Sequence, residues 1–202
     1  MRGNLTEAEV FIIESLDPDD EGNGRFEGSI ISQILQLHEK KSKYRYVRTK
    51  AQFKKAVLEF GKSNYRYLHI SAHADSEGMC TTNRDNIDYD ELAAILSKHL
   101  HGKRLFLSAC SMVHHKLASE ISHESGCLSI AGPKNDIKFS DAAILWSSFY
   151  HLMFSGNKNK MKSAEMKIHL NNISHLFNVN ILCFLKTKSG YNQKSFPENS
   201  IR

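Results

Sequence analysis

Tyr67-Leu68-His69-Ile70-Ser71-Ala72-His73 is one of two short apolar runs that decide the fold of this chain, and the other is Arg104-Leu105-Phe106-Leu107-Ser108-Ala109-Cys110. Each run is nearly continuous and is flanked by polar residues, a pattern typical of buried parallel strands. Functional sites in open parallel sheets lie beyond the carboxyl ends of the strands. If the two strands are neighbours, His73 and Cys110 meet at one edge of the sheet. A cysteine nucleophile needs such a base beside its thiol.

Further strands and helices are predicted from the spacing of apolar residues along the rest of the chain. Ser29 and Ser140 are predicted to cap their helices, and Asp88-Tyr89-Asp90-Glu91 has the form of a capping box. We expect strands at 10–15, 44–49, 127–132 and 180–185, a short outlying strand at 79–82, and helices at 29–37, 51–61, 88–99, 114–123, 140–153 and 163–177.

The stretch 16–28 is acidic and rich in turn-forming residues, and it is long for a connection between a strand and a helix. We expect it to be a loop over the carboxyl edge of the sheet, beside the proposed site. The alternation of strands and helices predicts an α/β fold with a mainly parallel sheet and helices on both faces.

The composition suits one domain, because the chain has 202 residues of which 41% are hydrophobic. We predict a domain over residues 1–186 and a polar, disordered tail over 187–202. No apolar run is long enough to cross a membrane, and the first residues lack the apolar core of a signal peptide. We therefore expect a cytoplasmic protein that does not bind membranes.

The net charge is +5, and much of it lies in residues 40–55 and 158–162. A basic doubly wound domain that binds nucleic acid through residues 40–55 is one alternative reading. Solvated loops and helix faces explain the same charges better, so nucleic acid is not an expected partner.

The cysteines are too widely spaced for a disulfide framework or a zinc ribbon, and neither a metal nor another cofactor is expected. Cys110 has a competing interpretation as a buried structural cysteine. Cys127 and Cys183 lie inside apolar strands and should be inert, and Cys80 has no histidine nearby in the sequence. Neither a glycine-rich phosphate loop nor a GxSxG elbow is present, which disfavours a nucleotide-binding domain and a serine hydrolase.

The two runs resemble the caspase-like cysteine peptidases, and most closely the small bacterial CHAT-domain proteins, relatives of metacaspases and separases. Tyr89-Asp90-Glu91-Leu92 and Ser140-Asp141-Ala142-Ala143 add to this likeness, which extends to about Leu185. The resemblance implies a three-layer caspase/hemoglobinase-like fold. It also implies an endopeptidase without cofactors, in which Cys110 is the nucleophile and His73 is the general base and acid.

The same resemblance implies a protein or peptide substrate and a partner or signal that orders the site loops. Several members of the family act in bacterial defence or programmed death. The backbone N–H groups of Ala74 and Cys110 would form the oxyanion hole. Ala74 stands where the family usually has glycine, and a positive φ there would cost about a kilocalorie per mole. A catalytically weak or inactive binding module that acts through a protein partner is therefore the alternative.

Relatives select the substrate side chain next to the scissile bond, called P1, through a pocket beside the nucleophile. An acidic pocket accepts Arg or Lys, and a basic pocket accepts Asp. Our candidate for a basic pocket is Arg25, and our candidates for an acidic pocket are Asp17, Asp19, Asp20, Glu21 and Asp141. Acidic residues outnumber basic ones in these loops, which favours Arg or Lys at P1.

Overall fold

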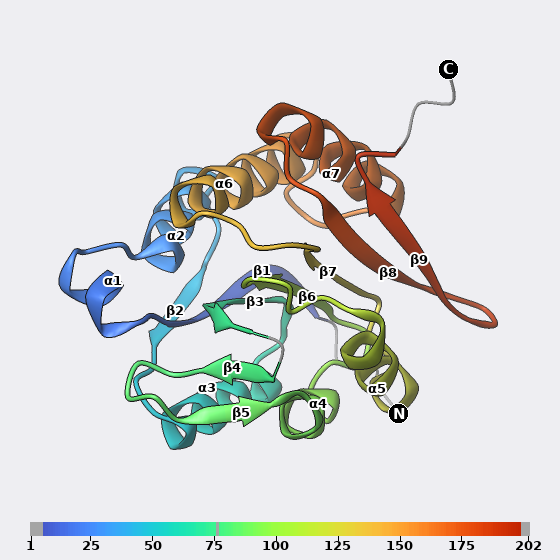
Figure 1. The fold of residues 1–202 in the computed structure, drawn as a ribbon. Helices are drawn as coiled ribbons and strands as arrows, with labels where there is room; N and C mark the ends of the chain where they lie inside the picture. The colour runs from blue at the N-terminus through green and yellow to red at the C-terminus, as the bar shows by residue number, and fades with distance from the viewer. Residues whose placement is uncertain (1–5, 76, 199–202) are drawn as a thin grey trace.

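The main sheet of the computed structural model, which describes residues 6–75 and 77–198, follows the strand order β2-β1-β3-β6-β7-β8-β9 (Figure 1). The strands from β2 to β7 run parallel to one another, and β8 and β9 are antiparallel additions at one edge. The strands are β1 (Glu7–Ser15), β2 (Lys43–Tyr46), β3 (Tyr65–Ala74), β6 (Arg104–Ser108), β7 (Ser129–Pro133), β8 (Ile181–Thr187) and β9 (Gly190–Phe196).

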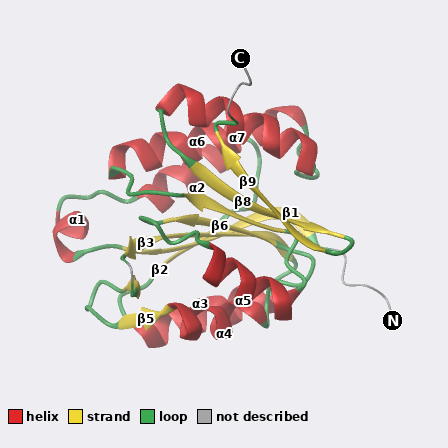
Figure 2. Ribbon diagram, turned by 45° about the vertical axis from the view of Figure 1, so that its right-hand side comes forward, coloured by secondary structure: helices red, strands yellow, loops and turns green. Residues whose placement is uncertain are grey.

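Helices cover both faces of this sheet (Figure 2). One layer holds α2 (Glu27–Leu37), α6 (Phe139–Gly156) and α7 (Ser163–Phe177), and the other holds α3 (Lys50–Lys62), α4 (Tyr89–Ser97) and α5 (His115–Ser125). A short helix, α1 (Pro18–Gly22), lies between β1 and α2, and the hairpin of β4 (Gly78–Cys80) and β5 (Asn86–Asp88) continues from the end of β3. The predicted α/β fold with a mainly parallel sheet is confirmed.

The two quoted runs form the centre of the sheet because each sends apolar side chains to both faces. In β6, which is buried along its whole length, Leu105 and Leu107 pack toward α3, α4 and α5. Phe106 packs on the other face against Trp146 and Phe149 of α6. Full burial of such side chains contributes about 1.5–3 kcal/mol each. This two-sided burial explains why the runs are continuous rather than alternating.

Three expectations about local structure are wrong. Residues 190–196 are not part of a disordered tail, because they form β9, which pairs antiparallel with β8. The stretch 16–28 contains α1 instead of being a loop throughout. The residues that cap α2 and α6 are Phe26 and Lys138, without side-chain hydrogen bonds, rather than Ser29 and Ser140.

The predicted cap of α4 is confirmed, since the Asp88 side chain accepts from the Glu91 N–H. Among the described residues, no helix is long and apolar enough to cross a membrane.

The close approach of β7 to β6 makes Gly132 a sensitive position. A Cβ at Gly132 would lie 2.3 Å from the backbone oxygen of Leu107 and 2.6 Å from Val113 Cγ2. We expect Gly132→Ala to lower the free energy of unfolding by about 1–3 kcal/mol or more, measured by urea denaturation. Gly156→Ala is the matched control, because no atom lies within 4 Å of its added Cβ. A Gly132→Ala protein as stable as this control would contradict the packing described.

Candidate active site

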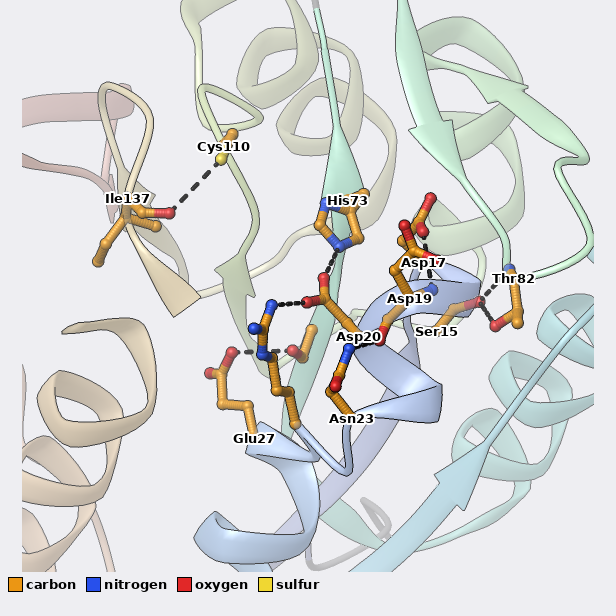
Figure 3. A network of polar contacts seen from close by, with 12 residues as sticks. Ser15, Asp17, Asp19, Asp20, Asn23, Glu27, His73, Thr82, Cys110 and Ile137 are labelled. Atoms are coloured by element: carbon orange, nitrogen blue, oxygen red, sulfur yellow. Dashed lines mark hydrogen bonds and ion pairs between the residues drawn. The ribbon is translucent and has the colours of Figure 1, made fainter. Parts of the chain in front are cut away.

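The pairing of β3 with β6 brings His73 and Cys110 to the same edge of the sheet. The register pairs Ser71 with Ser108, and two more residues along each chain lead to His73 and Cys110. Side chains alternate between faces along a strand, so Ser71, Ser108 and His73 point to the face covered by α2 and α6. Cys110 follows in the turn beyond β6. The structure thus places the histidine and the cysteine at the same edge of the sheet (Figure 3).

Cys110 lies in the turn that follows β6 and is half-buried. The next residue, Ser111, has a φ of +52°, which is uncommon for a residue with a side chain and marks a sharp turn. The Cys110 thiol faces the backbone oxygen of Ile137 at 3.8 Å and is turned away from the His73 ring (Figure 3). Ser111 Oγ donates to Asp136 Oδ1 at 3.2 Å, so the loop before α6 contacts this turn twice.

Helix α1 places a carboxylate against His73. Asp17 caps α1 by accepting from the Asp19 N–H, and Pro18 occupies the first turn. This start directs Asp20 inward, where its Oδ2 lies 2.7 Å from His73 Nε2. Arg25 donates to the other oxygen, Oδ1, at 2.7 Å. Asp20 is a predicted substrate-binding residue, and in this structure its carboxylate contacts the His73 imidazole and the Arg25 guanidinium.

The electrostatics of Asp20 follow from these two contacts. Burial favours the protonated carboxyl, but the hydrogen bonds and charges of Arg25 and His73 outweigh it, so the pKa of Asp20 lies below its ordinary value. An ionised Asp20 accepts a hydrogen bond from the N–H at His73 Nε2, which leaves Nδ1 of the ring as an acceptor. The ring stacks on Phe139 with centroids 6.5 Å apart, and 45% of the histidine side chain is exposed. His73 is therefore oriented and still accessible.

Ala74 is the last residue of β3 and is paired with Met79 of β4. It is not among the described residues with positive φ. The strain that a positive φ would impose on alanine is therefore absent at this position.

A cavity of about 450 Å³ lies beside Phe139, the ring that stacks on His73, and of the remaining predicted substrate-binding residues Arg25 lines it. Arg25, Phe139 and Ser140 line it, together with Ile30 and Ala143. Asp141 follows Ser140 in the first turn of α6 and is half-buried. Asp19 is exposed on α1, and its side chain takes no part in the contacts around His73.

Two buried carboxylates near His73 and Cys110 were missed by the sequence reasoning. Glu27 Oε2 accepts from Ser71 Oγ at 2.9 Å and from Ser108 Oγ at 3.0 Å. Glu14 accepts from the Gly28 N–H at 2.7 Å and from Tyr44 Oη at 2.6 Å. The signal that could have found them is the pair of serines at matching positions in two apolar runs, since buried hydroxyls require partners.

The other thiols are poorer candidates for a nucleophile. Burial raises the pKa of Cys127 and of Cys183 to about 12. Cys80 lies closer than the sequence suggested, because it pairs with His73 in the ladder of β3 and β4. Burial also raises the pKa of the Cys80 thiol, which keeps it protonated at neutral pH. Among the described residues, we find no group of three or more His, Cys, Asp or Glu side chains placed to hold a metal ion.

Comparisons with known proteins find the same fold at low sequence identity. No protein-family model and no curated protein matches this sequence. Two similar solved structures are those of a secreted C11 cysteine protease from Bacteroides thetaiotaomicron, one called iotapain and the other in complex with an irreversible peptide inhibitor. Their TM-scores are 0.60 and 0.59, with identities of 10% and 8%.

The match covers 89% of this chain and 66% of each solved chain, so this chain spans about two thirds of their length. At this identity the likeness establishes the fold, and the predicted three-layer caspase-like architecture is confirmed.

The buried carboxylate of Glu14 predicts a dependence of stability on pH. Burial raises its pKa from the ordinary 4.5 to about 7, so the folded state holds a proton that the unfolded state has released. The contribution of the protonated Glu14 to the free energy of unfolding is fully present below pH 4.5, and it is lost as the pH rises to about 7. We expect Glu14→Gln to gain roughly 2–3 kcal/mol of stability relative to the wild type between about pH 5 and about pH 8, by urea denaturation.

Glu59→Gln is the matched control for this measurement. The hydrogen bonds from Arg45 and Lys43 lower the pKa of Glu59 to about 2. Glu59 is therefore ionised in both states across the whole window, and its variant should show no such trend. A stability difference between Glu14→Gln and the wild type that is constant with pH would contradict a buried, protonated Glu14.

Proposed function

We propose that this chain is a cysteine endopeptidase of the caspase-like type. The observation that supports this most is the position of His73 and Cys110 at the ends of the adjacent strands β3 and β6. The ionised Asp20 on the far nitrogen of the imidazole adds support, because it leaves Nδ1 free to accept the thiol proton. The fold shared with C11 cysteine proteases agrees with this reading.

In the proposed reaction, His73 Nδ1 takes the proton from Cys110, and the sulfur attacks the carbonyl carbon of the scissile bond. The resulting oxyanion accepts hydrogen bonds from the backbone N–H groups of Cys110 and Ala74. His73 then gives its proton to the leaving amine as the C–N bond breaks. A water molecule, deprotonated by His73, hydrolyses the acyl-enzyme and restores the thiol. Asp20 stabilises the imidazolium that forms in each half of the reaction.

The Cys110 thiol must turn away from Ile137 before this reaction begins. Rotation about the Cα–Cβ bond suffices to change the direction of the sulfur. The contact at 3.8 Å supports a resting state that a partner, a signal or the substrate itself converts into the active one. We propose this dependence on an activator together with three further properties. These are a relation to CHAT-domain proteins, a role in bacterial defence or programmed death, and a cytoplasmic location.

We propose a protein or peptide substrate with Arg or Lys at P1. Arg25 was the candidate for a basic pocket, and its ion pair with Asp20 neutralises it. Asp141 lies next in sequence to the cavity residue Ser140 and remains available for a cationic side chain. The alternative function, an inactive binding module, is favoured by the thiol's contact with Ile137 in place of His73.

Labelling with a thiol-directed peptide probe tests the dyad directly. We expect an acyloxymethyl ketone with Arg at P1 to label Cys110 of the wild type, as located by peptide mapping. The analogue with Asp at P1 should label it more slowly. Labelling should be lost in His73→Ala, because the thiol then has no base.

Cys80→Ala serves as the control, since Cys80 is the other half-buried thiol near His73. This variant should be labelled like the wild type. Labelling of Cys80 at the same rate as Cys110, or cleavage activity that survives both Cys110→Ala and His73→Ala, would rule out the proposed dyad.

Asp20→Asn tests the role of the carboxylate behind the imidazole. The amide of Asn favours the wrong tautomer of His73 and cannot stabilise the imidazolium. We expect kcat for a peptide substrate to fall on the order of 100-fold, with a smaller change in KM.

Asp90→Asn is the comparison, because Asp90 is also in the first turn of a helix and pairs only with surface groups of α5. It should keep wild-type kinetics. Equal kcat values for Asp20→Asn and Asp90→Asn would remove Asp20 from the mechanism.

A further inference from the structure

Glu27 occupies an unusual position for an acidic residue. It lies in the first turn of α2 and is 1% exposed, beneath the edge of the sheet that carries the dyad (Figure 3). A single carboxylate oxygen, Oε2, accepts from hydroxyls on two different strands, Ser71 of β3 and Ser108 of β6. Each serine comes two residues before His73 or Cys110, and within β3 the Ser71 side chain lies on the same face as His73.

The pairing of Ser71 with Ser108 is the last one in the β3–β6 ladder. Beyond it, Cys110 enters a turn, and the end of β3 pairs with β4 instead. Within residues 6–75 and 77–198, no backbone pairing joins β3 to β6 beyond Ser71 and Ser108. The hydrogen bonds from Ser71 and Ser108 to Glu27 link β3 to β6 at the last paired residues before His73 and Cys110. We call this link, Ser71–Glu27–Ser108, the tie between the strands.

The start of α2 is itself held in place. The Gly28 N–H donates to Glu14 Oε1 of β1 at 2.7 Å. A Cβ at Gly28 would lie 2.9 Å from both Ile12 and Tyr44, so the helix lies as close to the sheet as the backbone allows. Glu27 therefore projects from an anchored point.

Burial of a carboxylate costs several kcal/mol unless hydrogen bonds compensate for the lost water. The two serine hydroxyls supply part of this compensation, and His69 Nε2 lies 3.4 Å from Oε1. Oε1 itself has no hydrogen-bond partner among the described residues. An apolar side chain would avoid this cost but would leave both hydroxyls unpaired and the strand ends untied. The hydrogen bonds that Glu27 accepts from Ser71 and Ser108 therefore explain why a carboxylate is buried here.

We propose that Glu27 is a positioning residue, which fixes the separation of the His73 imidazole and the Cys110 thiol by tying Ser71 to Ser108. The inference rests on the proposed function, because it concerns the efficiency of that dyad. It assigns Glu27 no contact with the substrate and no transfer of a proton.

Replacement of Glu27 by Gln and by Ala distinguishes the effect of its hydrogen bonds to the serines from the effect of its charge. The amide oxygen of Gln can accept both serine hydrogen bonds, so Glu27→Gln should keep kcat within about threefold of the wild type. Ala removes the acceptor, and Glu27→Ala should lower kcat on the order of 100-fold with KM little changed. A loss in Gln as large as that in Ala would show that the charge acts, and would overturn the proposal.

The serines provide a second test that does not depend on the folding of Glu27→Ala. The double variant Ser71→Ala/Ser108→Ala should lower kcat as Glu27→Ala does, and the triple variant should lose little more. Ser174→Ala is the matched control, because this buried serine of α7 has no hydrogen-bond partner among the described residues. Wild-type kcat in the double serine variant would refute the tie.

The alkylation rate of Cys110 by iodoacetamide at neutral pH needs no substrate. It should fall in Glu27→Ala to the rate found in His73→Ala, whereas Glu27→Gln should react like the wild type. If the wild type hydrolyses no peptide but shows this pattern, the proposed function fails while the role of Glu27 stands. A Glu27→Ala protein that alkylates at the wild-type rate, or a wild-type rate no higher than that of His73→Ala, would overturn it.

Discussion

The parallel pairing of β3 with β6 is the constraint on which the candidate site depends. Its register pairs Ser71 with Ser108, two residues before His73 and Cys110, and so brings both residues to the same edge of the sheet. A slip of one residue in either strand would send one member of the pair to the opposite face. The apolar side chains of both runs prevent such a slip, because it would also move Leu105 and Leu107 out of their core. The packing of the sheet therefore determines the geometry of the site.

This arrangement is accompanied by buried polar groups beneath His73 and Cys110. Ser71 and Ser108 share the row with Glu14, and all three point at the first turn of α2. Glu27 accepts hydrogen bonds from both serines of that row. Burial raises the pKa of Glu14 to about 7. Two carboxylates so close together in an apolar layer cost stability. Hydrogen bonds from Gly28, Tyr44 and the serines offset much of that cost.

The central elements could be predicted because their patterns are strong, and the failures have identifiable causes. Helix α1 has only five residues, too few for a helical period, so Asp20 could not be singled out among neighbouring acids. Strand β9 is an exposed edge strand in which only Phe196 is buried, so no alternation marks it. Glu27 lies in a loop-like stretch of the sequence, and only the tertiary fold shows that it points inward. The strand ends at His73 and Cys110 could be predicted from the sequence pattern alone, without the tertiary fold.

The division between scaffold and loops also bears on how the site is controlled. The strands hold His73 and the Cys110 backbone, but the direction of the thiol depends on the loop that precedes α6. That loop supplies the Ile137 oxygen to the sulfur and Asp136 to the neighbouring Ser111, whose positive φ shapes the turn. Any movement of this loop changes both contacts at once, while the β3–β6 ladder stays intact. A loop of this kind opens at much lower free energy than the buried strands, because few apolar contacts hold it. The orientation of the Cys110 thiol is therefore the least constrained part of a candidate site whose remaining geometry is fixed by the sheet.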